Sequence, residues 1–419
     1  LAAASILGAI VDIYRITGKT RFLEFAKTII DSGCCSRHNI FAAAREKIPL
    51  RKIGNGKAYE MMSCFEGLAA YCQYDPQPEY LEAVKNFFAA ICKNEIFITG
   101  SGGLMDMHGE YWGDGKFNQT RSSVGGLGET CVTVTYIHLC SALLKLTGDP
   151  VAAAELMNTT CNALLGAVSP DGKFWCHVNP TPLAGSSPKI PASDQISRAG
   201  ADSFDGHDCC LAQGPEGLAT VAMNAVMSSS DGVVLNYYEP MHVQCALPSG
   251  KFLQLECNSE YPYPGQIELR LHLAEPESFE LALLIPPWQQ SACSVSVNLE
   301  KVSAKPGEYL VLKRRWCDGD VVRFELDFSL RSCVSPDGRF VAFSTGPLLL
   351  SRDSRLGEVN TPVVAGNDCS ELPPCQENNI RLIRQLKDGS SLCDYISAGN
   401  AFHPGDVLRV WLEPENSSQ

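Results

Sequence analysis

The sequence predicts a protein of two domains, in which repeated α-helical hairpins are followed by an antiparallel β-sandwich. Up to about residue 232 the apolar residues recur with the helical period of about 3.6, whereas from about Asn236 they alternate with the strand period of about 2. The length of 419 residues allows two domains, each large enough to bury a core. We therefore expect a helical domain over residues 1–232 and a β-sandwich domain over residues 233–419.

The helical half contains pairs of amphipathic helices that recur at intervals of roughly sixty to seventy residues. Each pair is interrupted by a short polar break, at 17–19, 73–78 and 147–150. Gly18 and Gly148 lie where the end of a helix accepts a left-handed residue, and Pro150 suits the first position of the following helix. These signals predict helical hairpins.

Helical hairpins of this kind must stack, because none can bury its apolar face alone. Two glycine-rich inserts, 99–103 and 111–115, of which the second carries Tyr111 and Trp112, favour a closed ring whose loops converge on one mouth. Roughly three and a half hairpins are visible, and a six-hairpin ring needs more. We therefore expect part of an (α/α)6 barrel, and a chain that begins inside a longer protein at Leu1.

The β half shows alternating apolar residues in three segments, 252–257, 267–273 and 321–326. Turn residues separate the runs, for example Pro248-Ser249-Gly250 and Asp318-Gly319. This pattern is typical of an antiparallel sandwich. The polar stretch 366–389 reads as a long loop or insert.

Composition narrows the range of partners. The chain is 45% apolar and 19% charged, as in soluble globular proteins, and its net charge is −13. The absence of a basic cluster disfavours nucleic acid, and no apolar run has the eighteen or so residues of a membrane span. We expect an uncharged small molecule or glycan as the partner.

Four residues that could bind a metal lie in two distant segments. Glu129 and Cys131 open one predicted helix, and Cys209-Cys210 precede another that we expect to begin near Gly214. Thiolates combined with one carboxylate suit a tetrahedral Zn²⁺ ion. Residues two apart on a helix lie about 200° apart, so Glu129 and Cys131 can share an ion only if the first turn is extended. Ordinary buried thiols are the alternative, because the chain has 19 cysteines.

The same segments carry a resemblance to a known family. The residues are Gly128-Glu129-Thr130-Cys131, Asn162-Ala163-Leu164-Leu165-Gly166, His207-Asp208-Cys209-Cys210 and Ile285-Pro286-Pro287-Trp288. In this order they resemble the β-L-arabinofuranosidase family of glycoside hydrolases, and the likeness covers most of the chain. The resemblance implies an (α/α)6 barrel followed by a β-sandwich, and a retaining mechanism with a zinc-bound cysteine as nucleophile.

The resemblance also implies residue roles. Cys209 would be the nucleophile, Glu110 the acid/base catalyst, and Glu129, Cys131 and Cys210 the remaining zinc ligands. Asp106 and Asp114 are the neighbours that could replace Glu110. The residues that we expect to contact the substrate, an oligosaccharide or glycoside, are His207, Tyr111, Trp112, Lys57 and Glu60. Lys57 stands where better-known members carry a histidine, so the sugar specificity is open. A salt-bridged pair of Lys57 and Glu60 is the alternative.

Two other functions remain open. A conventional glycosidase or lyase could use the two carboxylates of Glu110 and Asp114 and leave the cysteines idle. A non-catalytic glycan-binding protein could use zinc only to stabilise the barrel. The many thiols favour a reducing cytoplasm without deciding the compartment, and a homodimer is compatible with the sequence.

Overall fold

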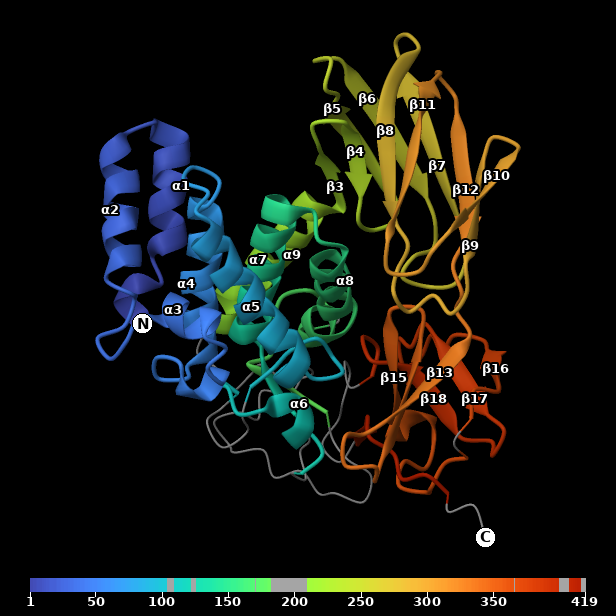
Figure 1. The fold of residues 1–419 in the computed structure, drawn as a ribbon. Coiled ribbons are helices and arrows are strands. Elements are labelled where there is room, and N and C mark those ends of the chain that lie inside the picture. The colour runs from blue at the N-terminus through green and yellow to red at the C-terminus, as the bar shows by residue number, and fades with distance from the viewer. Residues whose placement is uncertain are drawn as a thin grey trace.

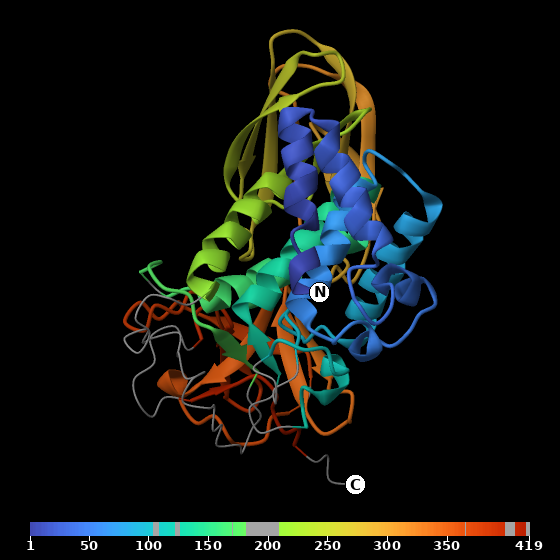
Figure 2. The ribbon, with the colours of Figure 1, turned by 90° about the vertical axis from the view of Figure 1, so that its left-hand side faces the viewer.

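A computed structural model describes residues 1–103, 109–121, 126–169, 171–181, 209–364, 366–398 and 407–415. A helical region lies on one side of the molecule and two regions of β-strands lie on the other (Figures 1 and 2). Helices predominate as far as Ala225, and strands predominate from Val226 onward. This order confirms the mixed organisation with a β-rich C-terminal part. The expected boundary after residue 232 falls at the first residue of a strand that begins at Gly232.

The helical region is a double row of helices. The helices are α1 (Leu7–Thr17), α2 (Thr20–Asp31), α3 (Ile40–Arg45), α4 (Ala58–Tyr71), α5 (Pro78–Asn94), α6 (Gly115–Asn118), α7 (Thr130–Thr147), α8 (Pro150–Thr159) and α9 (Cys209–Ala225). In chain order α1, α4, α7 and α9 pack against one another, while α2, α5 and α8 pack beside α1, α4 and α7. Stacked hairpins therefore form, as predicted.

The hairpin breaks have the expected cap residues. Gly18 ends α1 with φ 65° and Gly148 ends α7 with φ 66°, both left-handed. The Asp149 carboxylate accepts a hydrogen bond from the amide of Val151 at 2.9 Å, and Pro150 takes the first position of α8. Each cap satisfies backbone groups that a helix end otherwise leaves unpaired.

Helix α7 is the central helix of this region. Its length and composition would allow it to cross a membrane, but 72% of the apolar stretch is buried inside the protein. It contacts α4 on one side and α9 on another. A helix that is apolar on all sides and enclosed in this way is a core helix.

The first β-region consists of two sheets that share one hydrophobic core. Their strands are β3 (Val226–Ser228), β4 (Gly232–Leu235), β5 (Met241–Ala246), β6 (Phe252–Asn258), β7 (Gln266–Leu273), β8 (Glu277–Leu284), β9 (Cys293–Val297), β10 (Glu300–Ala304), β11 (Tyr309–Trp316) and β12 (Val321–Glu325). One sheet has the order β10-β9-β12-β7-β6-β5 and the other β11-β8-β4-β3. The three segments predicted from alternation are β6, β7 and β12.

One strand pair in this region departs from the antiparallel expectation. Strands β4 and β8 pair in parallel, with Val233 opposite Leu281. Parallel neighbours need a crossover connection. Here the chain crosses through β5, β6 and β7 of the other sheet before it returns.

The second β-region is a single sheet whose buried residues belong partly to the main core and partly to a smaller core of their own. Its strands are β13 (Leu330–Val334), β14 (Val341–Thr345), β15 (Leu348–Asp353), β16 (Cys369–Leu372), β17 (Ile383–Leu386), β18 (Ser391–Asp394) and β19 (Leu408–Arg409). The smaller core includes Phe340, Tyr395 and Trp411. Strands β16 and β17 pair within 366–389, so the prediction of a loop there was wrong. Strand β16 lies at the sheet edge and buries too little apolar surface to alternate clearly.

Candidate zinc and catalytic site

A short pair of strands fixes the first metal-ligand segment. Strand β1 (Leu127–Glu129) pairs antiparallel with β2 (Val178–Pro180), and Glu129 lies opposite Val178. Glu129 has φ −70° and ψ 137°, an extended conformation, and α7 begins one residue later. The condition for Glu129 and Cys131 to point to one place is therefore met.

The second ligand segment is the first turn of α9. The helix begins at Cys209, five residues before the start that we expected near Gly214, and it contains Pro215. A β-carbon on Gly214 would lie only 2.0 Å from Cδ2 of Trp175, so this turn of α9 packs directly on the buried indole. That close packing sets the position of the two cysteines.

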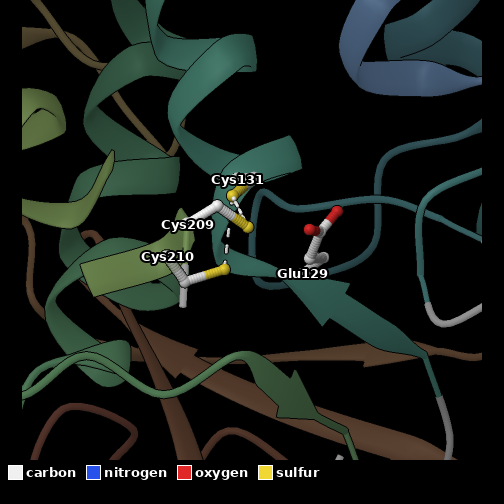
Figure 3. Close-up of side chains that lie close together, drawn as sticks. All are labelled: Glu129, Cys131, Cys209 and Cys210. Carbon is white, nitrogen blue, oxygen red and sulfur yellow. Dashed lines mark hydrogen bonds between the residues drawn. The ribbon is translucent and has the colours of Figure 1, made fainter. Parts of the chain in front are cut away.

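The four residues form one cluster (Figure 3). Sγ of Cys131 lies 3.2 Å from Sγ of Cys209 and 3.3 Å from Sγ of Cys210. One oxygen of Glu129 and the three sulfur atoms all lie within 4.8 Å of one another. Glu129, Cys131 and Cys210 are buried, but Cys209 is exposed. Residues about eighty positions apart thus converge as predicted.

The cluster holds its protons tightly when no cation is bound. Burial, followed by the charges of Glu110 and Cys209, raises the pKa of Glu129 to about 8. Hydrogen bonding with Cys209 raises the pKa of the Cys131 thiol, and hydrogen bonds to Cys131 and Cys209 raise that of Cys210. The raised pKa values favour the neutral forms of these groups. A divalent cation would reverse the shifts, because it attracts the charged forms.

The donor set fits a zinc ion. Around tetrahedral zinc, with Zn–S bonds of about 2.3 Å, sulfur atoms lie about 3.8 Å apart, so the cluster would open by roughly half an ångström. The Oε2 atom of Glu129 is buried and has no hydrogen-bond partner among the described residues. An unsatisfied buried carboxylate oxygen beside three sulfur atoms is the arrangement that such an ion would complete.

The loop that carries Glu110 is anchored to the start of α4. The amide of Ala58 donates to the carbonyl of Glu110 at 2.7 Å, and the amide of Trp112 donates to the carbonyl of Gly56 at 2.9 Å. Gly109, with φ 78°, packs so tightly on β1 that a β-carbon would lie 2.7 Å from the Leu127 carbonyl oxygen. Glu110 is therefore held beside Glu129, which explains its effect on the Glu129 pKa.

Lys57 links two carboxylates in this site. Its Nζ lies 3.2 Å from Oε2 of Glu110 and 3.6 Å from Oε1 of Glu60. Burial opposes the charge of Lys57, but the hydrogen bond to Glu110 and the charges of Glu110 and Glu60 raise the pKa of this amine overall. The predicted salt bridge between Lys57 and Glu60 forms, and it extends to Glu110.

The other predicted site residues differ in their burial and in their partners. Tyr111 is half-buried, and its backbone bridges to that of Lys57. Trp112 is only 3% exposed and belongs to the hydrophobic core. Asp114 pairs with Arg51. Asp106 and His207 lie outside the described residues.

Two residues near the cluster were not predicted. Nδ1 of His177 lies 3.6 Å from Sγ of Cys210, and the carbonyl of His177 accepts the amide proton of Thr130. Tyr59, on the first turn of α4, has a raised pKa because of burial and the nearby charges of Cys131, Glu216 and Cys209. Neither residue belongs to a recognisable motif, so only the fold reveals their positions.

Comparisons with known proteins identify the family of the chain. Residues 4–223 match the GH127 catalytic domain of β-L-arabinofuranosidases, and residues 232–328 match the GH127 middle domain. Such domains are those of glycoside hydrolases. The chain belongs to the GH127 family, the β-L-arabinofuranosidases, which confirms the family resemblance.

Individual relatives have low sequence identity to this chain but align with most of its length. The non-reducing end β-L-arabinofuranosidase of Bifidobacterium longum subsp. longum is 23% identical over 377 residues, which are 81% of this chain and 56% of that protein. The chain therefore spans little more than half the length of that relative. A solved glycoside hydrolase aligns with a TM-score of 0.80 at 20% identity, over 99% of this chain and 75% of that one. A GH127 β-L-arabinofuranosidase from Geobacillus stearothermophilus T6 aligns with a TM-score of 0.78 at 18% identity, over 98% and 72%.

Proposed function

We propose that this chain carries the active site of a retaining glycoside hydrolase that cleaves β-L-arabinofuranosides of oligosaccharides. The observation that carries the proposal is the exposure of Cys209: of the three clustered thiols it alone reaches the surface, while Cys131 and Cys210 are buried. A nucleophile must be accessible to substrate, whereas a purely structural ligand need not be. The helical rows would belong to an (α/α)6 barrel and the strands that follow to a β-sandwich.

Glu129, Cys131, Cys209 and Cys210 would hold Zn²⁺. When bound, the ion would keep the thiols ionised and make the Cys209 sulfur a better leaving group than an ordinary thiolate. Buried carboxylate and thiol groups beside one exposed thiol support this assignment. The proposal needs no other cofactor.

The residues act in two steps. In the first, the Cys209 sulfur attacks the anomeric carbon, the bond to the glycosidic oxygen breaks, and Glu110 gives its proton to that oxygen. In the second, Glu110 takes a proton from water, the water oxygen attacks the same carbon, and the bond from carbon to sulfur breaks. Two inversions at one carbon give overall retention.

The residues around Glu110 would bind the sugar. Lys57, Glu60 and Tyr111 lie beside Glu110. The charged groups of Lys57 and Glu60 can contact sugar hydroxyls, and the aromatic ring of Tyr111 can contact a face of the sugar ring. His207 is proposed as a further contact. Because Trp112 packs in the core, the proposal relies on Tyr111 rather than on Trp112. The β-L-arabinofuranoside preference rests on the family and on the relative's name.

The mechanism can be tested by replacing Cys209 with alanine. We expect Cys209→Ala to lower the turnover of an aryl β-L-arabinofuranoside by about 10³-fold or more, because Cys209 is the exposed thiol of the described cluster and forms the covalent bond. Cys317→Ala is the control: it removes an exposed thiol of the first β-region and should keep full turnover. Zinc content is measured on both variants. Full activity of Cys209→Ala would favour the glycosidase or lyase with two carboxylates.

The acid/base assignment distinguishes Glu110 from Asp114. Both carboxylates have a cationic partner, Arg51 for Asp114 and Lys57 for Glu110, but the charge of Glu110 also acts on Glu129 of the cluster. We expect Glu110→Gln to slow unactivated glycosides by about 10² to 10⁴-fold and activated aryl glycosides much less, because a good leaving group needs little proton donation. Asp114→Asn should stay within about fivefold of the parent. The reverse ranking would assign the acid to Asp114. Stoichiometric zinc without turnover of any glycoside in the parent would instead favour a glycan-binding protein.

A further inference from the structure

One buried carboxylate near the proposed active site takes no part in the two steps. Glu95 directly follows the last residue of α5 and is only 1% exposed. Burying an acid costs free energy unless hydrogen bonds compensate it, and the C-terminal end of a helix is the unfavourable end for a negative charge. The groups that compensate Glu95 therefore indicate its role.

The partners of Glu95 are backbone amides of the segment that follows Glu110. Oε2 of Glu95 accepts from the amide of Gly113 at 3.1 Å and from the amide of Gly115 at 3.0 Å. Burial raises the pKa of Glu95, and hydrogen bonds from these amides and from that of Asp114 act in the opposite direction. A hydrogen bond to an ionised carboxylate is about twice as strong as one between neutral groups, so Glu95 holds this segment firmly.

The same segment packs directly on the end of α5. A β-carbon on Gly115 would lie 2.9 Å from the carbonyl oxygen of Glu95 and 2.8 Å from Cε1 of Phe97. Both contacts are too short for a real side chain, so any residue larger than glycine would push the segment away from α5. Glycine at this position therefore lets the two amides reach the Glu95 carboxylate.

The loop that carries the proposed acid/base catalyst is thus held from two sides. On the side of α4, the carbonyl of Glu110 accepts from the amide of Ala58. On the side of α5, Glu95 holds the amides of Gly113 and Gly115. A catalytic side chain must stay within about 0.5 Å of its productive position, which requires that the backbone carrying it be fixed.

We propose that Glu95 is a positioning residue for the acid/base catalyst. By holding the amides of Gly113 and Gly115, it keeps the carboxyl group of Glu110 where that group reaches the glycosidic oxygen. Glu95 acts through the backbone and does not itself contact the substrate. This inference rests on the role proposed for Glu110 and adds to it the residue that fixes its loop.

Two variants of Glu95 separate its reach from its charge. Glu95→Asp keeps the charge but draws the carboxylate back by one carbon–carbon bond of about 1.5 Å, so the two amides must follow it or lose their acceptor. Glu95→Gln removes the charge but keeps an acceptor oxygen at the same reach. A positioning role predicts that aspartate impairs the enzyme and that glutamine does not, whereas a role of the negative charge predicts the reverse.

The test is the dependence of turnover on the leaving group. An activated aryl and an unactivated alkyl β-L-arabinofuranoside are compared. We expect Glu95→Asp to lower kcat about tenfold or more on the alkyl glycoside but less than about threefold on the aryl glycoside, because a displaced acid fails mainly where the leaving group needs a proton. KM should change less than about twofold on either substrate. Glu95→Gln should stay within about threefold of the parent on both.

The ratio of the two rates separates positioning from general damage, because a loss of folded protein lowers both rates equally. Glu155→Asp is the matched control. Glu155 also accepts a hydrogen bond, from the hydroxyl of Tyr136 at 3.0 Å, but lies on α8 outside the loop of Glu110. Its shortening should leave the ratio unchanged. Equal losses on both glycosides in Glu95→Asp, or a selective loss in Glu95→Gln as large as that in Glu95→Asp, would overturn the proposal.

A second substitution displaces the same segment if Glu95→Asp does not fold. Gly115→Ala places a methyl group 2.9 Å from the carbonyl oxygen of Glu95, so the segment must move away from α5. We expect the same selective loss on the alkyl glycoside, again about tenfold or more. Equal losses on the two glycosides in this variant would also contradict the positioning role.

Two measurements distinguish a failure of this inference from a failure of the proposed function. Glu110→Gln is assayed on the same two glycosides, and the absence of a selective loss there would reject the acid/base role itself. Amide hydrogen exchange of residues 109–118 needs no turnover, and it should be faster in Glu95→Asp than in the parent and in Glu95→Gln. Unchanged exchange would overturn the anchoring by Glu95 even with Glu110 as the acid.

Discussion

Cys209 and Cys210 are neighbours in sequence but differ in their surroundings. Both lie on the first turn of α9, yet Cys210 is fully buried against Cys131 and His177, whereas Cys209 is exposed. Consecutive residues on a helix point about 100° apart, so one can face the interior while the other faces solvent. This difference would let one pair of adjacent thiols supply a buried metal ligand and an accessible sulfur.

Zinc binding should release protons, because three of the four ligands hold theirs tightly. The pKa of Glu129 is raised to about 8, and those of Cys131 and Cys210 are also raised. Zinc binds only the deprotonated forms, so raising the pH removes competing protons. We expect the apparent affinity for zinc to rise about tenfold or more per pH unit between about pH 6 and pH 8. Competition with a chelator of known affinity measures it.

The same prediction has an independent calorimetric check. Zinc titrations in buffers of different ionisation enthalpy give the number of protons released per ion. Glu129→Gln removes the one titrating carboxylate of the cluster, so it should release about one proton fewer near pH 7. An affinity that does not change with pH would show that the ion binds elsewhere.

Lys57 is an example of a residue whose role the structure makes more specific. From sequence it was either a sugar contact or the partner of Glu60. It lies between Glu60 and Glu110, so it places a positive charge beside the proposed acid/base catalyst. Any change of Lys57 would therefore affect Glu110 as well as the proposed contact with the sugar.

The elements that bring the ligands together were only partly predictable. Periodicity and cap residues predicted the helical hairpins and three of the strands, because these signals are local. The starting point of α9 was misplaced because Gly214 and Pro215 look like a helix start. Gly214 instead lies inside α9, where it packs against Trp175, a residue distant in sequence. Strand β16 and the parallel pairing of β4 with β8 likewise depend on neighbours that no local pattern identifies.

The packing of α9 on Trp175 leads to a prediction about both stability and metal binding. In Gly214→Ala the new methyl group would lie 2.0 Å from the indole, so the first turns of α9 must move. We expect a loss of about 1–3 kcal/mol in the free energy of unfolding and a weaker zinc site, since Cys209 and Cys210 move with the helix. Urea denaturation and zinc competition measure the two effects.

The matched control for this change is Gly8→Ala on α1. A β-carbon there would meet its nearest neighbour at 3.7 Å, an ordinary contact. Alanine inside a helix should be neutral or stabilising by up to about 1 kcal/mol. If Gly214→Ala behaved like Gly8→Ala, α9 would not be positioned by Trp175.

The three regions of the molecule are joined by specific polar contacts as well as by apolar packing. The hydrophobic core of the helical region continues into the first β-region. The main core also includes residues of the second β-region, such as Phe343 and Leu350, beside the smaller core that this region forms itself. Polar contacts with the helical region are made through Asn162, Thr120 and Arg339. Arg339 donates to the carbonyl of Thr120 at 2.7 Å, and the Thr120 hydroxyl donates to Asp337 at 3.0 Å. These hydrogen bonds therefore add directional contacts to the apolar packing between the helical region and the second β-region.

Asn162 is the strongest of these contacts and can be tested alone. Its side chain is buried, donates to the carbonyl of Pro347 at 3.0 Å and accepts from the amide of Leu349 at 2.8 Å, at the start of β15. Asn162→Ala leaves both backbone groups buried and unpaired, so we expect the free energy of unfolding to fall by about 2–4 kcal/mol. Asn86→Ala loses one hydrogen bond within the helical region and should cost under about 1 kcal/mol. Urea denaturation compares them, and limited proteolysis should cut Asn162→Ala faster between the regions. Equal stability of the two variants would mean that apolar packing alone fixes the second β-region on the helices.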